Sequence, residues 1–262
     1  MGNNVFIAYF DFLGFKQFIL NNDSNHLNTR TDHILRDIEC ALSKNRPAID
    51  VGQPHSVYDI SNSILNCINF SDTVIFWTRD AKIESLKELI EVATIFNSHE
   101  NIHFFPIRCC ITFGELSAKV GQATSKNQSY YRPNFVYGKG LIEAYELAES
   151  LDMAGTIVTS EVVDLLISNT EHQFIISNLL QFHVQYKTCV TEEYMLPFLN
   201  LDRVETSDRP AFNPVLLFNN ISESIRKNFI RDNKTIDMRT QAKIERTIEF
   251  LKFNVDSIRT NF

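Results

Sequence analysis

The chain has 262 residues, a hydrophobic fraction of 44% and a formal net charge of −7 at pH 7. This acidic total argues against general nucleic-acid binding, and the longest apolar runs are shorter than the roughly twenty residues that a membrane helix needs. Five cysteines without a C-x-x-C pair argue against a disulfide framework or a zinc site. We therefore expect a cytoplasmic protein without a signal peptide.

In the first half of the chain, hydrophobic periodicity and turn residues predict alternating strands and helices. Ser43 to His55 carries two prolines and a glycine and is expected to be a loop. The predicted elements are a strand at Val5–Phe10, helices at Leu13–Leu20 and Leu27–Leu42, a hairpin of Val57–Ile68 and Phe70–Trp77, a helix from Asp80 to Phe96 and a strand at Ile102–Phe113.

In the second half, Ala118–Pro133 is polar and is predicted to form a mobile loop or a long hairpin near the site. Glu205–Pro214 has two prolines and several charges and is typical of a linker. We expect one domain over residues 1–203, followed by this linker and a helical extension over residues 204–262. The other predicted elements are a helix at Gly140–Leu151, a strand at Thr156–Thr159, a helix at Glu161–Ile167, a strand at Phe182–Tyr186 and a last sheet segment at Met195–Leu201.

A carboxylate follows the first predicted strand directly. Asp11 comes after the apolar run Val5–Phe10, and Gly14 follows three residues later. Burying a carboxylate there is costly unless it is paired or holds a metal ion. The backbone amides after it could face an anion where a helix begins. The alternative is that Asp11 only caps the helix Leu13–Leu20.

A second acid interrupts another apolar stretch. Asp72 lies in the middle of Cys67–Trp77, which has the composition of a buried strand. Two divalent cations need shared carboxylates on rigid neighbouring elements. If the two stretches pair antiparallel, Asp11 and Asp72 can point to the same side, and the pair then predicts a two-metal site.

Five blocks of the sequence resemble, in the same order, those of class III nucleotidyl cyclases. Ser71 stands where that family usually has glycine. Within the family, the chain resembles most the bacterial pyrimidine cyclases of anti-phage defence. The blocks are Phe10–Phe15, Phe70–Thr73, Ile107–Gly114, Tyr137–Leu147 and Ala154–Glu161.

The resemblance implies an α+β, ferredoxin-like domain with a mixed, mainly antiparallel sheet. It implies conversion of a pyrimidine nucleoside triphosphate, UTP as the first choice and CTP as the second, to the 3′,5′-cyclic nucleotide, with two Mn²⁺ or Mg²⁺ ions. The product would act on a separate effector protein. Because such sites form between two catalytic domains and one is visible here, it also implies a head-to-tail homodimer with two equivalent sites.

For individual residues, the resemblance assigns Asp11, Asp72 and the carbonyl of Phe12 to the metal ions. Arg108 would hold the terminal phosphates; the alternative is a surface ion pair at a strand end. Lys139 could reach phosphate from the other subunit, or could be a solvated lysine in a turn. The amides from Leu13 to Phe15 would lie against the β- and γ-phosphates, with Gly14 allowing close approach.

Three positions depart from the general family. Ile142 replaces the usual asparagine, Glu146 the transition-state arginine and Ile68 a base-reading lysine or glutamate. The purine-cyclase set is therefore absent. Either the pyrimidine branch uses other groups, with Arg132 or Lys139 replacing the arginine, or the chain binds a nucleotide without converting it.

Amide and phenol side chains are the candidates for reading a pyrimidine base, although the pattern favours for each of them a structural role, capping an element or lying at the core edge. A linear or dimeric product, as from GGDEF or palm-type enzymes, is disfavoured because no G-G-[DE]-[DE]-F-like turn occurs. The base-reading candidates are Asn66, Asn69, Tyr58 and Tyr130.

Overall fold

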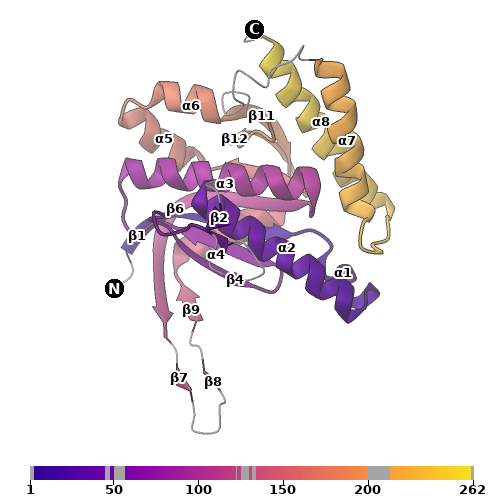
Figure 1. The fold of residues 1–262 in the computed structure, drawn as a ribbon. Coiled ribbons are helices and arrows are strands. Elements are labelled where there is room, and N and C mark those ends of the chain that lie inside the picture. Colours follow the sequence, from indigo (N-terminus) through magenta and orange to yellow (C-terminus); the bar gives the residue numbers. More distant parts are fainter. Residues whose placement is uncertain are drawn as a thin grey trace.

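The fold is taken from a computed structural model that describes residues 3–44, 48–49, 57–121, 123–124, 130–131, 134–199 and 213–260. An eight-stranded sheet lies at its centre, in the order β11-β12-β10-β6-β1-β5-β4, with β9 paired to β6 (Figure 1). The strands of this sheet are β1 (Asn3–Phe12), β4 (Asn66–Phe70), β5 (Thr73–Trp77), β6 (Ile107–Val120), β9 (Asn134–Tyr137), β10 (Gly155–Val158), β11 (Leu180–Gln185) and β12 (Val190–Met195).

Helices cover both faces of the sheet, and two short hairpins lie outside it. The helices are α1 (Phe15–Asn21), α2 (Ser24–Ser43), α3 (Ile83–His103), α4 (Lys139–Ser150), α5 (Ser160–Ser168), α6 (His172–Asn178), α7 (Pro214–Ile230) and α8 (Met238–Thr260). The short hairpins pair β2 (Ala48–Ile49) with β3 (Val57–Tyr58), and β7 (Ala123–Thr124) with β8 (Tyr130–Tyr131).

The chain order and the sheet order together define the fold class. The elements β1, α1–α2, β4, β5, α3 and β6 form a β-α-β-β-α-β unit whose strands lie in the antiparallel order β6-β1-β5-β4. This is the ferredoxin-like arrangement. β10 then joins parallel to β6 after α4. The predicted α+β, ferredoxin-like fold is confirmed.

Side chains alternate strictly along β1, and this decides which face each one serves. Phe6, Phe10 and Phe12 lie in the core beneath α2 and α3. Ile7 and Tyr9 lie in the second core, beneath α4, α7 and α8. Asp11 continues the second set, so it points to the face that α4 covers.

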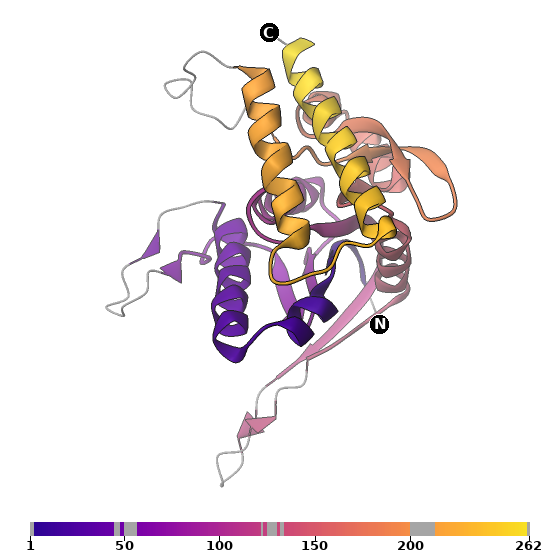
Figure 2. The same cartoon turned by 90° about the vertical axis from the view of Figure 1, so that its right-hand side faces the viewer.

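The C-terminal helices pack into this second core. Ile225 and Phe229 of α7 and Ile248 of α8 are buried in the same apolar cluster as Ile7 of β1. Figure 2 shows α7 and α8 side by side, with their connection next to α1. The predicted helical extension is thus observed as helices that cover the sheet, while a domain boundary at residue 203 stays a prediction. The linker prediction falls mainly outside the described residues.

The predicted boundary between α3 and β6 is wrong by about two helical turns. α3 runs to His103, and β6 begins only at Ile107. The carboxylate of Glu100 accepts the amide of Phe105, and the side chain of Asn101 accepts the amide of Ile107. These buried acceptors hold the helix end, and the apolar pattern that suggested a strand does not reveal them.

Two other predictions are corrected. Val57–Ile68 is not one strand, because Asp59 accepts the amide of Ser61 in a turn that precedes β4. The described parts of Ala118–Pro133 form hairpin strands, as expected, but they leave the sheet at the end of β6 far from Arg108. Arg132 lies outside the described residues. None of the described helices combines the length and apolarity needed to span a bilayer.

Candidate active site

Asp11 is held between two neighbouring strands. It lies opposite Thr73 in β5 and opposite Arg108 in β6, and it is 8% exposed. Arg108 Nε donates to Asp11 Oδ2 at 2.8 Å. Burial raises the pKa of Asp11 to about 6, although the charge of Arg108 acts in the opposite direction. The residue that caps α1 is Gly14, without a side-chain hydrogen bond, so the capping role considered for Asp11 is wrong.

Asp72 lies in the two-residue turn that joins β4 to β5, so the expectation that it interrupts a strand is wrong. The turn is tight: Phe70 pairs with Thr73, and Ser71 has a φ of 55°. A positive φ favours glycine, which gives a physical reason for the glycine that the resembling family usually has at Ser71. The two-residue turn places Asp72 at the tip of the hairpin.

The β1–β5 pairing brings the two acids together. Phe12 N donates to the carbonyl oxygen of Asp72 at 2.9 Å, one residue beyond the Asp11–Thr73 pair. Burial is the main cause that raises the pKa of Asp11, and it raises the pKa of Tyr9 to about 12. The charge of Asp72 adds to both shifts, and the charge of Asp11 adds to that of Tyr9. Asp11 of β1 and the turn that holds Asp72 are therefore adjacent in the fold, while the shared binding of metal ions by the two acids stays a prediction.

In this structure, the guanidinium of Arg108 makes several hydrogen bonds to protein groups. Besides Asp11, its guanidinium donates to the carbonyl oxygen of Glu149 at 3.0 Å and to the Glu149 carboxylate, and it is 7% exposed. A phosphate contact by Arg108 stays a prediction, because these contacts leave the residue buried among its own partners. Its observed contacts are those of a residue that positions the carboxylate of Asp11.

The segment after Asp11 has fewer backbone amides that could bind a phosphate than the sequence predicted. The amide of Phe12 is used by Asp72, and that of Leu13 donates to the Pro106 carbonyl at 2.8 Å. The expectation that Leu13 presents its amide to phosphate is therefore contradicted, and Gly14 and Phe15 remain as candidates. Gly14 has a φ of 78°, a conformation that side-chain-bearing residues rarely adopt.

The structure does not bring Lys139 to these acids within one chain. It is the exposed first residue of α4, and the next residue, Gly140, packs against Gly114. Glu149, which contacts Arg108, is ten residues further along the helix, about 15 Å away. Any contact of Lys139 with the acids of a site must therefore involve a second copy, as the resemblance implied.

Asp11 and Asp72 lie at one end of the sheet, which we call the acid end. Sequence reasoning missed two residues there. The Tyr9 hydroxyl lies 3.1 Å from Thr73 Oγ1, and its ring packs edge-on against Tyr145. Glu149 supplies a second carboxylate to Arg108. Tyr9 could have been found, because a residue two positions before Asp11 in a strand shares its face. Nothing local to Glu149 marks it, since its partner is far away in the sequence.

The donor set at the acid end fits hard divalent cations. Among the described residues no group of three or more His, Cys, Asp or Glu side chains could hold a metal ion. Mg²⁺ commonly binds through one or two carboxylates and completes its shell with water and substrate phosphates. Asp11 and Asp72, with the Phe12 carbonyl, match that pattern. The raised pKa of Asp11 also indicates a carboxylate whose burial one arginine does not fully compensate.

No protein-family model matches the sequence, and no curated protein matches it significantly. Several solved structures are similar over about three quarters of this chain. The adenylyl cyclase CyaB from P. aeruginosa is 12% identical, with 75% of this chain and 94% of that chain covered and a TM-score of 0.46. The guanylate cyclase domain of RhGC from Catenaria anguillulae, in complex with GTP, is 9% identical, with 74% and 96% covered and a TM-score of 0.48.

A dimeric guanylyl cyclase domain of the RhoGC fusion protein from Blastocladiella emersonii is 10% identical, with 74% and 94% covered and a TM-score of 0.47.

Proposed function

We propose that this chain is a metal-dependent nucleotidyl cyclase that converts a pyrimidine nucleoside triphosphate, UTP first and CTP second, to the 3′,5′-cyclic nucleotide and pyrophosphate. The observation that carries the proposal is the pairing of β1 with β5, which joins Asp11 to the turn that holds Asp72. Both acids lie within sequence blocks that resemble class III cyclases. The preference for pyrimidines rests on the resemblance and on Ile68, Ile142 and Glu146, where the purine set is absent.

In the proposed reaction, the ribose 3′-oxygen attacks the α-phosphorus and pyrophosphate leaves. When bound, two divalent cations would lower the pKa of the 3′-hydroxyl and neutralise the negative charge of the triphosphate. Asp11, Asp72 and the Phe12 carbonyl would hold them. Arg108 binds Oδ2 of Asp11 and favours its ionised form, which leaves Oδ1 for a cation. Arg108 is therefore a positioning residue in this proposal.

The second half of the site is proposed to come from the other end of the sheet in a partner copy. A groove of about 430 Å³ lies there, within the size range of ligand pockets. It includes Val5 of β1, which is six residues and about 20 Å from Asp11. That span is much longer than the distance from the base to the α-phosphorus of a nucleotide, so one chain cannot serve both ends of its own substrate.

The walls of this groove suit a nucleobase. Trp77 and Tyr137 offer aromatic surface, Asn66 an amide that can donate or accept, and Arg79 and Lys119 positive charge. An amide that can be turned over serves the exocyclic oxygen of UTP or the amine of CTP, so the groove suits either base. Asn66 is the base-reading candidate that the groove supports.

Exposed apolar side chains support the head-to-tail homodimer. On α4, Ile142 is 58% exposed and Tyr145 48%; on β9, Phe135 is 64% exposed. β9 lines the groove through Tyr137, and α4 begins directly after Gly138. We propose that this surface contacts a second copy. The proposed product would signal to a separate effector protein in anti-phage defence, and the cytoplasmic location stays a prediction.

The experiment that tests the function is product identification by mass after incubation of the protein with all four triphosphates and Mn²⁺. A cyclic pyrimidine nucleotide and pyrophosphate are expected. A cyclic purine product would overturn the pyrimidine assignment alone. Metal-dependent nucleotide binding without any product would instead support the rival, a nucleotide sensor with this fold.

A further inference from the structure

The connection between α7 and α8 is held against α1 and α2 by ion pairs and hydrogen bonds. Asp232 pairs with His26 at 2.8 Å and with Arg30 at 3.2 Å, and the carbonyl oxygen of Asn233 accepts from Asn21 at 2.7 Å. Asp232 and Asn233 both have positive φ values, 65° and 56°. This segment therefore has a defined conformation set by contacts with the elements that follow Gly14.

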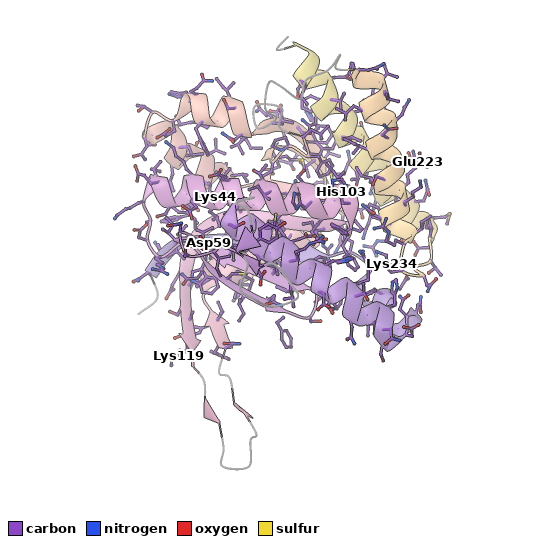
Figure 3. All side chains as sticks on the ribbon, in the orientation of Figure 1. Lys44, Asp59, His103, Lys119, Glu223 and Lys234 are labelled. Atoms are coloured by element: carbon purple, nitrogen blue, oxygen red, sulfur yellow. The ribbon has the colours of Figure 1, made fainter. Side chains whose placement is uncertain are left out.

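Lys234 is the buried member of that connection. It is 8% exposed, and its Nζ has no hydrogen-bond partner in the described part of the chain. The ammonium lies 5.0 Å from the centre of the Phe105 ring. Burial lowers the pKa of Lys234 to about 8, although the charges of Asp232 and Glu100 act in the opposite direction. Figure 3 labels Lys234 at the connection, next to α1. Such a cation lacks the hydrogen bonds that burial normally requires.

A cavity of about 80 Å³ separates this connection from the segment after Asp11. That volume is several times the roughly 10–15 Å³ that one water needs. Its walls include Leu13 and Gly14 on one side, and Lys234 and Lys243 on the other. Thr235, Thr240 and Gln17 add polar groups, and no acidic side chain lines it. Leu13 and Phe229 add apolar surface, and two lysines in a lining without carboxylates favour an anion over a cation.

The cavity adjoins the acid end of the sheet. The charge of Arg108 helps to lower the pKa of Lys243, after the effect of burial, and Arg108 is bonded to Asp11. No hydrogen bond or ion pair holds the Lys243 ammonium among the residues that the structure describes. A Cβ atom on Gly14 would come within 2.9 Å of Lys234 Cδ, so the absent side chain of Gly14 makes room for the lysine stem.

We propose that this cavity is a phosphate subsite in which Lys234 and Lys243, supplied by the C-terminal helices, bind the polyphosphate end of the nucleotide and the pyrophosphate product. The inference rests on the proposed function for the identity of its ligand. The reason is charge: two lysines without ion-pair partners line a cavity beside the predicted metal acids, and a polyphosphate would supply the acceptors they lack. The C-terminal extension then completes the phosphate end of the site.

The test is calorimetric titration of the full chain with inorganic pyrophosphate, without divalent cations. Wild-type protein is expected to bind, and Lys234→Met and Lys243→Met to lose at least tenfold in affinity. Lys252→Met is the matched control, because Lys252 is an exposed lysine of α8 away from the cavity, and it is expected to bind as wild type. Wild-type affinity in both cavity variants, or no binding by the wild type, overturns the proposal.

A second readout separates a purely structural role for Lys234. If Lys234→Met lowers the melting temperature but leaves pyrophosphate affinity unchanged, the lysine only packs on Phe105 and the proposal fails. If that variant does not fold, Lys243→Met decides alone, since Lys243 is only half-buried. Loss of pyrophosphate binding in the cavity variants, together with a wild type that makes no cyclic product, supports the subsite and overturns the proposed function instead.

Discussion

The two ends of β1 differ in whether their charged side chains are buried and paired. At one end, Asp11, Arg108 and Glu149 are joined in one buried or half-buried network beside Asp72. At the other, Arg79 and Lys119 are exposed beside the aromatic walls of an open groove, and neither makes an ion pair among the described residues.

This difference in burial and pairing indicates that the two ends have different roles. Charged groups that must keep a fixed geometry are buried and held by partners, because preorganisation depends on restricted side chains. A surface that recognises an incoming group stays open and carries unpaired donors. In the proposed function, one chain offers the chemical half of a site at one end and the recognition half at the other, and two copies join them.

The largest effect is expected from breaking the acid end. Asp72→Ala should lower cyclic product by more than about a hundredfold, because a direct metal ligand should matter more than the residues that support ligands. The free energy of unfolding should change by no more than about 1 kcal/mol, since Asp72 is half-buried in a turn.

The measurement is product formation beside thermal unfolding. Asp164→Ala, which removes an exposed acid from α5, is the matched control and should keep full activity. Retention of half of the wild-type activity by Asp72→Ala would refute the assignment of the acids.

The proposed joining of the two ends can be broken at the exposed surface of α4, without changing Asp11, Asp72 or a residue that lines the groove. Ile142→Arg places a charge on the exposed face of α4 and should convert the dimer to a monomer, with loss of most cyclase activity. Light scattering after size-exclusion chromatography measures the mass. Ile176→Arg on α6, where the isoleucine is 72% exposed, is the matched control and should stay dimeric and active. A fully active Ile142→Arg monomer would mean that one chain contains a whole site.

The smallest expected effect concerns pH. The pKa of Asp11 is raised to about 6 in the folded chain, so this carboxyl is mostly protonated at pH 5 and ionised at pH 7.5. Since the folded state holds this proton more tightly than the unfolded state, the metal-free protein loses the corresponding stability as pH rises through about 6. Mn²⁺ should therefore raise the melting temperature more at pH 7.5 than at pH 5.

The measurement is thermal unfolding with and without Mn²⁺ at both pH values. In Asp11→Asn the pH dependence of the Mn²⁺ effect should disappear. Equal Mn²⁺ effects on the wild type at pH 5 and pH 7.5 would show that Asp11 does not take part in binding.

The sequence predicted much of the sheet because the signals are local. The apolar run at Val5–Phe10 predicted β1, and its two-residue period decided that Asp11 shares a face with Tyr9. The ferredoxin-like class was implied by the resemblance of five sequence blocks to class III nucleotidyl cyclases, and the observed strand order confirms it. Local pattern failed where a turn was tight: Ser71 and Asp72 were read as strand because apolar residues flank them on both sides.

What the sequence alone determined is that an acid follows the apolar run of β1 and that another interrupts the apolar stretch of β4 and β5, because composition and periodicity act over a few residues. Only the tertiary structure decided their surroundings: that Arg108 binds Asp11 and Glu149, and that Lys234 lies over Gly14. These contacts join residues from distant elements, and their energies come from burial and charge in a packed interior. No local pattern of residues encodes such an environment.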